Sequence, residues 1–119
     1  MIRIVDKMMY LAQGDTATVE FTPEFLGLSV DASDRLLFLL TSESAELYRE
    51  ILAPDENGVF TLHLADTQDI PVGEYRWQVR QYTNAVVEDG NVTGDEVNTP
   101  FGPQSFKVME VLGDGIVYA

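Results

Sequence analysis

The strongest constraint on the fold is the spacing of apolar side chains, which recur at every second position in several segments. In the clearest segment, residues 72–82, charged or polar side chains alternate with Tyr75, Trp77 and Val79. Successive side chains of a β-strand point to opposite faces of its sheet, so this alternation is typical of a strand with one buried face. Residues 16–22 and 58–64 show the same alternation. We therefore expect paired strands to build the core.

Other segments are assigned to strands without that alternation. Residues 36–40 are apolar at every position, which is typical of a central strand covered on both faces. Residues 45–53 also suit an amphipathic helix. We favour a strand, because Asn57-Gly58 follows and Asn-Gly between apolar runs is a strong hairpin signal. Short strands at 8–11 and 106–112 bring the total to about seven, which predicts an antiparallel sandwich.

The chain has 119 residues, so we expect a single β-sandwich domain over residues 1–119. Residues 84–103 are polar and predict either a long loop or a small hairpin that turns at Asp89-Gly90. Residues 113–119 are expected to form a short C-terminal tail.

The net charge excludes two classes of partner. Twenty acidic residues against seven basic ones give a formal charge of −13. Binding of DNA or RNA depends on Lys and Arg neutralising phosphates, so this chain should repel nucleic acid, and anionic membranes are disfavoured for the same reason. A basic protein or a cation would be attracted, although a large charge mainly keeps a protein soluble.

The chain contains no cysteine, which removes disulfides, thiolate metal sites and cysteine nucleophiles. Charges at Arg3, Asp6 and Lys7 interrupt the apolar core that a signal peptide requires. No apolar run is long enough to span a bilayer. We expect a chain that is made and kept in the cytoplasm, or is assembled into a particle there.

The sequence shows no catalytic or cofactor-binding motif. His63 is the only histidine, and the alternation places it away from the core. Acidic pairs such as Asp66 with Asp69 lie in predicted loops, where solvated carboxylates are the simpler interpretation. We expect no enzymatic activity and no cofactor. A calcium site is conceivable on the side-chain oxygens of Asp89, Asn91 and Asp95. The spacing of these residues differs from that of the known twelve-residue calcium-binding loop.

Residues 71–77, Pro-Val-Gly-Glu-Tyr-Arg-Trp, resemble the start of strand F in immunoglobulin-like domains. There, a tyrosine hydroxyl forms a corner contact that ties two strands together, and Trp77 stands where antibody domains have a disulfide cysteine. Because cysteine is absent, the resemblance implies the same kind of sandwich but not an antibody-type domain. The expected fold class is therefore all-β, an immunoglobulin-like antiparallel β-sandwich of about seven strands.

Three short motifs also resemble the N-terminal immunoglobulin-like domain of the baseplate upper protein of tailed phages. They are residues 12–16, Asn57-Gly58 and Pro71-x-Gly73-x-Tyr75. In that family the domain is a structural part of the baseplate and attaches a receptor-binding apparatus. This chain ends soon after its last strand, so we expect a virion component without the receptor-binding link.

We therefore expect a non-enzymatic assembly module of a phage or prophage tail or baseplate. It would act through protein–protein contacts, by docking on a larger protein or by self-association as a homo-oligomer. The strands at 8–11 and 106–112 are the first candidates for adding to a neighbour's sheet. The alternative is a carbohydrate- or peptide-binding accessory domain of a bacterial surface system. The candidate binding residues are Tyr48, Tyr82, Phe101, Ile116, Val117 and Tyr118.

Overall fold

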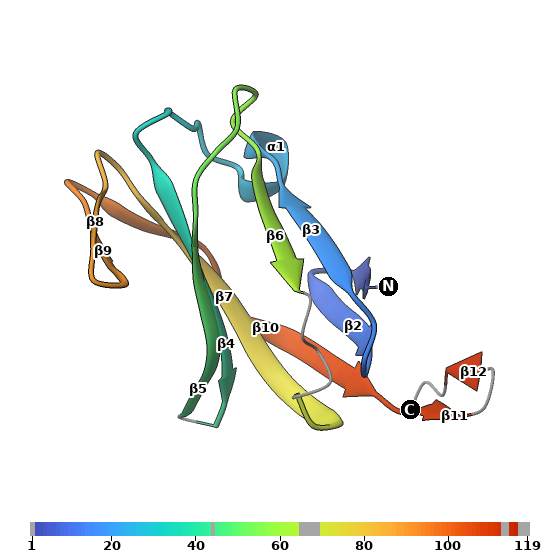
Figure 1. The fold of residues 1–119 in the computed structure, drawn as a ribbon. Helices are drawn as coiled ribbons and strands as arrows, with labels where there is room; N and C mark the ends of the chain where they lie inside the picture. The colour runs from blue at the N-terminus through green and yellow to red at the C-terminus, as the bar shows by residue number, and fades with distance from the viewer. Residues whose placement is uncertain (1, 44, 65–69, 113–114, 117–119) are drawn as a thin grey trace.

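The computed structural model describes residues 2–43, 45–64, 70–112 and 115–116, and these form an all-β molecule with one short helix (Figure 1). A six-stranded sheet has the order β1-β2-β10-β7-β4-β5, and a second sheet pairs β3 with β6. The elements of these sheets are β1 (Ile2–Val5), β2 (Met8–Ala12), β3 (Ala17–Phe21), β4 (Arg35–Ser42), β5 (Ala45–Leu52), β6 (Phe60–Leu64), β7 (Gly73–Tyr82) and β10 (Val97–Met109).

Four short strands form two separate pairs, β8 (Val86–Glu88) with β9 (Asn91–Thr93) and β11 (Val111–Leu112) with β12 (Gly115–Ile116). The pairs are antiparallel with one exception, because β2 and β10 run parallel. The expectation of a wholly antiparallel sandwich is therefore corrected at this pair. The physical reason is that β2 and β10 come from opposite ends of the chain, where no hairpin fixes an antiparallel direction.

The core lies between the two sheets and confirms the predicted alternation. In β3 and β6 the apolar residues are buried and the polar ones between them are exposed. Trp77 of β7 is fully buried, with its ring centroid 6.1 Å from that of Phe21 in β3 and 6.4 Å from that of Phe38 in β4. Aromatic contacts at this spacing add to the stabilisation from apolar burial. The side chains of Phe21, Phe38 and Trp77 thus connect the two sheets.

The predicted corner contact is present at the start of β7. The hydroxyl of Tyr75 donates a hydrogen bond to the carbonyl oxygen of Pro71. Two residues on, the indole Nε1 of Trp77 donates to the carbonyl oxygen of Lys7, at 2.9 Å. These bonds tie β7 to the segment before it and to the turn between β1 and β2.

Residues 45–52 form strand β5, which confirms the choice of strand over helix. The predicted hairpin at Asn57-Gly58 is wrong, because β5 pairs with β4 while β6 pairs with β3. Only Gly58 has a positive φ, of 76°, and the Asp55 carboxylate accepts hydrogen bonds from the backbone of Asn57 and Val59. The turn carries the chain from one sheet to the other, so its flanking strands share only an isolated bridge between Pro54 and Phe60.

For the polar stretch 84–103 the sequence leaves a long loop and a small hairpin as alternatives, and the structure contains the hairpin. Asp89 and Gly90 have φ of 53° and 77° and connect β8 to β9, as the turn chemistry predicts. From Val97 onward, however, the segment belongs to β10 and not to a loop. Prolines and register shifts interrupt the alternation there, which is why the sequence pattern placed the start of this strand too late.

A four-residue helix, α1 (Pro23–Leu26), connects β3 to the loop before β4. The Thr22 side chain caps its first turn by accepting a hydrogen bond from Phe25, and Gly27 ends it in the left-handed conformation. The ring of Phe25 lies against that of Phe21, so α1 closes one end of the core.

Candidate functional site

Phe101, expected as an exposed aromatic, is 7% exposed and therefore unavailable as a binding platform. It lies on the inner face of β10 opposite Val79. Its ring centroid is 5.6 Å from that of Trp77 and 4.9 Å from that of Phe25. The expectation failed because β10 begins before Phe101 and turns this side chain into the core.

The two candidate tyrosines are half-buried and lie apart. Tyr48 pairs with Leu40 on the inner face of the sheet, whereas Tyr82 pairs with Arg35 on the opposite face, five residues away along β4. The Tyr48 hydroxyl donates to Glu50. Burial raises the pKa of Tyr48 well above its ordinary value of 10.0, and the hydrogen bond and charge of Glu50 add to this rise. The structure does not bring these residues into one site.

The remaining candidates lie at the C-terminus. Ile116 belongs to β12, which pairs with β11 and not with either large sheet. Val117 and Tyr118 lie outside the described residues, as do Asp66 and Asp69. His63 is exposed, and its Nδ1 is 3.0 Å from the hydroxyl of Thr18 on the neighbouring strand.

The strands first considered for strand addition are not at a sheet edge. β2 lies between β1 and β10, and β10 lies between β2 and β7. Within the described ranges, the edges of the six-stranded sheet are β1 and β5. Each exposes aliphatic side chains, with Ile4 and Val5 on β1 and Leu47 on β5 exposed by 39%, 42% and 45%.

Basic side chains gather on the outer face of the six-stranded sheet, which is the face turned away from β3 and β6. Register and alternation place six of the seven basic residues there, but only two of the twenty acidic ones, Glu46 and Glu74. We call this surface the basic face, and its basic residues are Arg3, Arg35, Arg49, Arg76, Arg80 and Lys107. No single segment of the sequence shows this grouping.

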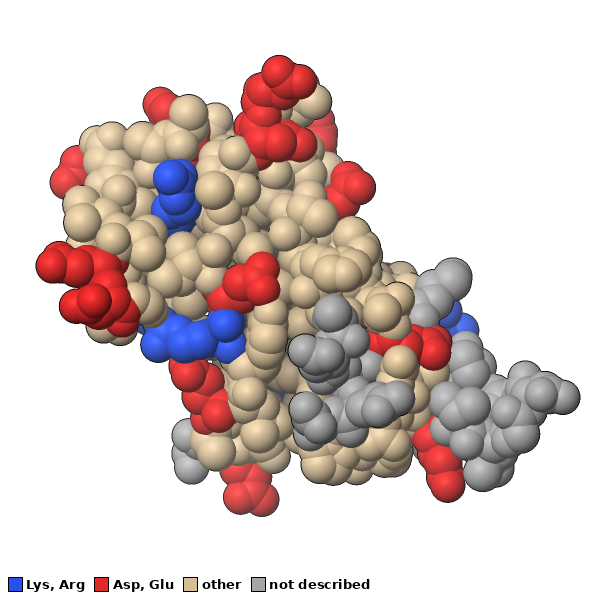
Figure 2. All heavy atoms as spheres, viewed as in Figure 1, with Lys and Arg blue, Asp and Glu red and all other residues tan. Residues whose placement is uncertain are grey.

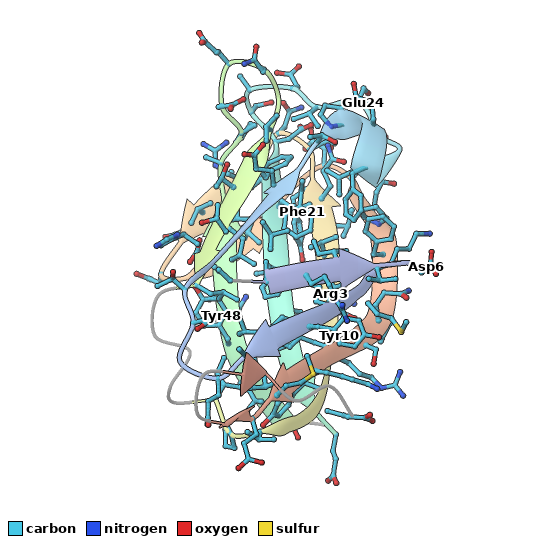
Figure 3. All side chains as sticks on the ribbon, turned by 90° about the vertical axis from the view of Figure 1, so that its right-hand side faces the viewer. Arg3, Asp6, Tyr10, Phe21, Glu24 and Tyr48 are labelled. Carbon is cyan, nitrogen blue, oxygen red and sulfur yellow. The ribbon has the colours of Figure 1, made fainter. Side chains whose placement is uncertain are left out.

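At one end of the basic face, charged and aromatic groups form a row across four strands. Lys107 of β10 pairs with Glu74 of β7, with Nζ and Oε1 3.3 Å apart. The Arg3 guanidinium carbon lies 5.0 Å from the ring centroid of Tyr10, and Lys107 lies 5.9 Å from the same ring. Figure 3 shows Arg3 and Tyr10 side by side on the first two strands. Cation–π contacts hold the positive groups at this end.

At the centre of the basic face, two arginines are exposed and pair with no charged group among the residues that the structure describes. Across the described part of the chain, Arg76 and Arg80 make no ion pair and no side-chain hydrogen bond. Arg49 is held only loosely, 3.8 Å from Glu46. Leu39 and Ile51 lie half-buried on the same face, by their pairing with Arg49 and Leu37. The centre therefore combines unpaired cations with apolar side chains.

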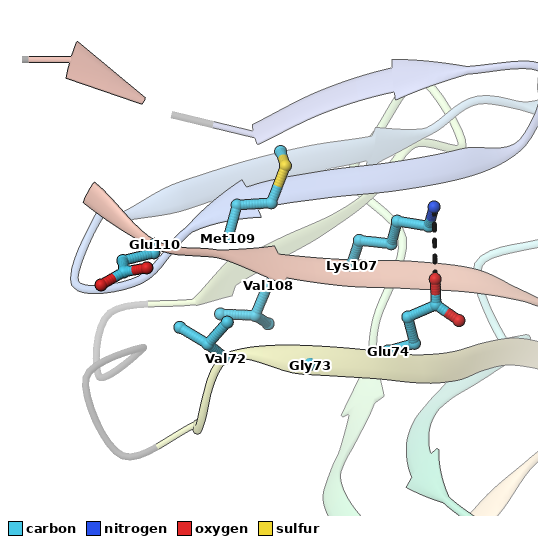
Figure 4. A pocket seen from close by; sticks show the side chains of 7 residues that line it. All are labelled: Val72, Gly73, Glu74, Lys107, Val108, Met109 and Glu110. Atoms are coloured by element: carbon cyan, nitrogen blue, oxygen red, sulfur yellow. Dashed lines mark ion pairs between the residues drawn. The ribbon is translucent and has the colours of Figure 1, made fainter. Parts of the chain in front are cut away.

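A hollow of about 230 Å³ lies between the start of β7 and the end of β10 (Figure 4). Val72 and Val108 line it, and the Glu74–Lys107 ion pair stands beside it. Among the described residues, no three His, Cys, Asp or Glu side chains lie together so that they could hold a metal ion. Within the described ranges, no helix has the length and hydropathy needed to cross a membrane.

Comparisons with protein-family models, with curated proteins and with solved structures gave no significant match.

Proposed function

We propose that this chain is a non-enzymatic assembly module, a structural component of a phage or prophage tail or baseplate, which acts through protein–protein contacts. The observation that carries the proposal is the basic face, where Arg76 and Arg80 stand exposed beside half-buried Leu39 and form no ion pair with any described residue. The corner contact of Tyr75 supports the immunoglobulin-like comparison on which the virion part of the proposal rests.

Arginine is among the residues that contribute most to protein–protein binding, because it combines a broad apolar stem with a planar group of hydrogen-bond donors. Two such side chains without a partner remain hydrated and leave their donors available to another protein. The leucine and isoleucine of the same face add apolar area that a partner would remove from water. Protein–protein interfaces commonly combine apolar side chains and arginine in this way.

Sedimentation velocity over a micromolar concentration range tests the proposal. We expect the protein to self-associate, and we expect Arg80→Glu to shift it to the monomer. Lys7→Glu is the matched control, because it changes the charge equally while its side chain lies outside the basic face, over Phe101. A protein that is monomeric at every concentration, or two variants that associate equally well, would contradict self-assembly through this face.

A further inference from the structure

We propose that the partner of the basic face is the acidic end of a second copy of this chain. The inference rests on the proposed function, and it adds the identity of the partner and the surface that it contributes. A contact between two different surfaces of identical chains is heterologous, so repetition of the contact leads to a ring or a filament.

The acidic end is formed by α1, the loop after it and the turn between β5 and β6. A Cβ atom at Gly58 of that turn would lie 3.4 Å from Val30 of the loop and 3.5 Å from Pro23 of α1, so the three segments are packed together. Four exposed carboxylates project from them, and the described residues offer none of these an ion-pair partner: Glu24, Asp31, Asp55 and Glu56.

The two surfaces meet only at Arg35, whose guanidinium donates hydrogen bonds to the carbonyl oxygens of Ala32 and Asp34 in the loop after α1, and elsewhere they lie on different parts of the molecule. Figure 2 shows acidic side chains at the top, where Figure 1 places α1 and the turn between β5 and β6. Figure 3 labels Glu24 at this end and Arg3 farther down the molecule. One copy can therefore present its acidic end to a neighbour while its own basic face stays accessible.

Screening decides whether a chain of charge −13 can bind a copy of itself. At physiological ionic strength charges farther apart than about 8 Å are largely screened. The contact therefore depends on nearby groups, which are cations on one side and carboxylates on the other. On the basic face six basic residues oppose two acidic ones, so the local charge is positive although the whole chain is negative. Charge complementarity at the contact thus outweighs repulsion between distant groups.

Charge reversal on each surface, followed by mixing, tests this contact. The face variant is Arg76→Glu with Arg80→Glu, and the end variant is Glu24→Arg with Glu56→Arg. Asp55 is left intact, because its carboxylate holds the backbone of the turn. We expect each variant alone to associate at least about tenfold more weakly than the parent, because two attractive charge pairs become repulsive. An equimolar mixture should recover association, since each variant keeps the surface that the other lacks.

A control variant separates the two proposals. Glu88→Arg with Glu96→Arg makes the same charge change on exposed residues outside the acidic end, and it should associate like the parent or more strongly. If the face variant dissociates while the end variant does not, the face is an interface but the acidic end is not its partner, and this inference is wrong. If neither variant dissociates, the proposed function through this face fails as well. Dissociation of both without recovery on mixing would also overturn the inference.

Discussion

At the scale of single residues, the corner contact of Tyr75 gives the most direct test of the fold. Tyr75→Phe removes the hydroxyl that donates to Pro71 but keeps a ring that is only 9% exposed. We expect the free energy of unfolding to fall by about 0.5–1.5 kcal/mol, the usual contribution of one hydrogen bond. Urea unfolding measures this change. Tyr82→Phe is the control, because its hydroxyl makes no hydrogen bond with the described residues, and an equal loss in both variants would contradict the corner's role.

The raised pKa of Tyr48 predicts a dependence of stability on pH. The folded protein holds this proton more tightly than the unfolded chain, whose tyrosine pKa is near 10. The resulting stabilisation is complete below that pH and is lost as the pH rises through the higher pKa of the folded state. Stability should therefore fall more steeply above pH 10 in the parent than in Tyr48→Phe. Unfolding measured at pH 8 and pH 11 tests this, and parallel losses would disprove it.

At the scale of elements, the hairpin of β8 and β9 depends on one glycine. A Cβ at Gly94 would lie 2.5 Å from the carbonyl oxygen of Thr83, which already accepts a hydrogen bond from Asp95 at 2.8 Å. The Cβ is fixed rigidly to the backbone of residue 94 and the oxygen belongs to the backbone of Thr83, so these two segments must separate to relieve the clash. We expect Gly94→Ala to destabilise the protein by about 2 kcal/mol or more.

Gly102→Ala is the matched control for this change. A Cβ at Gly102 meets no atom within 4 Å, and its φ is not positive. We expect its effect on the free energy of unfolding to stay within about 0.5 kcal/mol. Thermal unfolding of both variants measures the difference, and equal effects would show that contact with Thr83 does not set the position of this hairpin.

The strands were predictable where local pattern and burial agree. Alternation identified β3, β6 and β7, because each has one face on the core and one in solvent. The start of β10 was not predictable, because prolines interrupt it and its pairing with β7 shifts twice. The sequence of the turn at Gly58 is typical of a hairpin, yet the strands on its two sides pair in different sheets, so the turn connects the sheets. Local turn chemistry fixes the geometry of a turn, while tertiary pairing selects which strands it joins.

The candidate site was less predictable than the fold. Arg49, Arg76 and Lys107 are separated by at least 27 positions in the sequence. Arg76 and Lys107 each lie between buried residues of their strands, and Arg49 lies between half-buried ones. Only the order of β5, β4, β7 and β10 within the sheet brings them onto one face. The formal charge of −13 concealed this grouping, because a sum over the chain contains no information on position.

At the scale of the whole molecule, the opposition between net charge and local charge predicts how association depends on salt. At 0.01 M ionic strength the Debye length is about 30 Å, so the full charge of each copy repels the other. At 0.1 M it is about 10 Å, which suppresses that repulsion but leaves contact pairs attractive. At 1 M it is about 3 Å, and the contact pairs themselves are weakened.

We therefore expect the association constant to pass through a maximum near 0.1 M salt and to fall on both sides, as measured by sedimentation at a fixed protein concentration. Association driven by apolar contact alone should instead strengthen steadily with salt, because screening only removes repulsion. The face variant Arg76→Glu with Arg80→Glu should lose the maximum and keep only that steady rise. A parent protein that associates more strongly at 1 M than at 0.1 M would show that apolar side chains, such as Leu39 and Ile51, form the contact without the arginines.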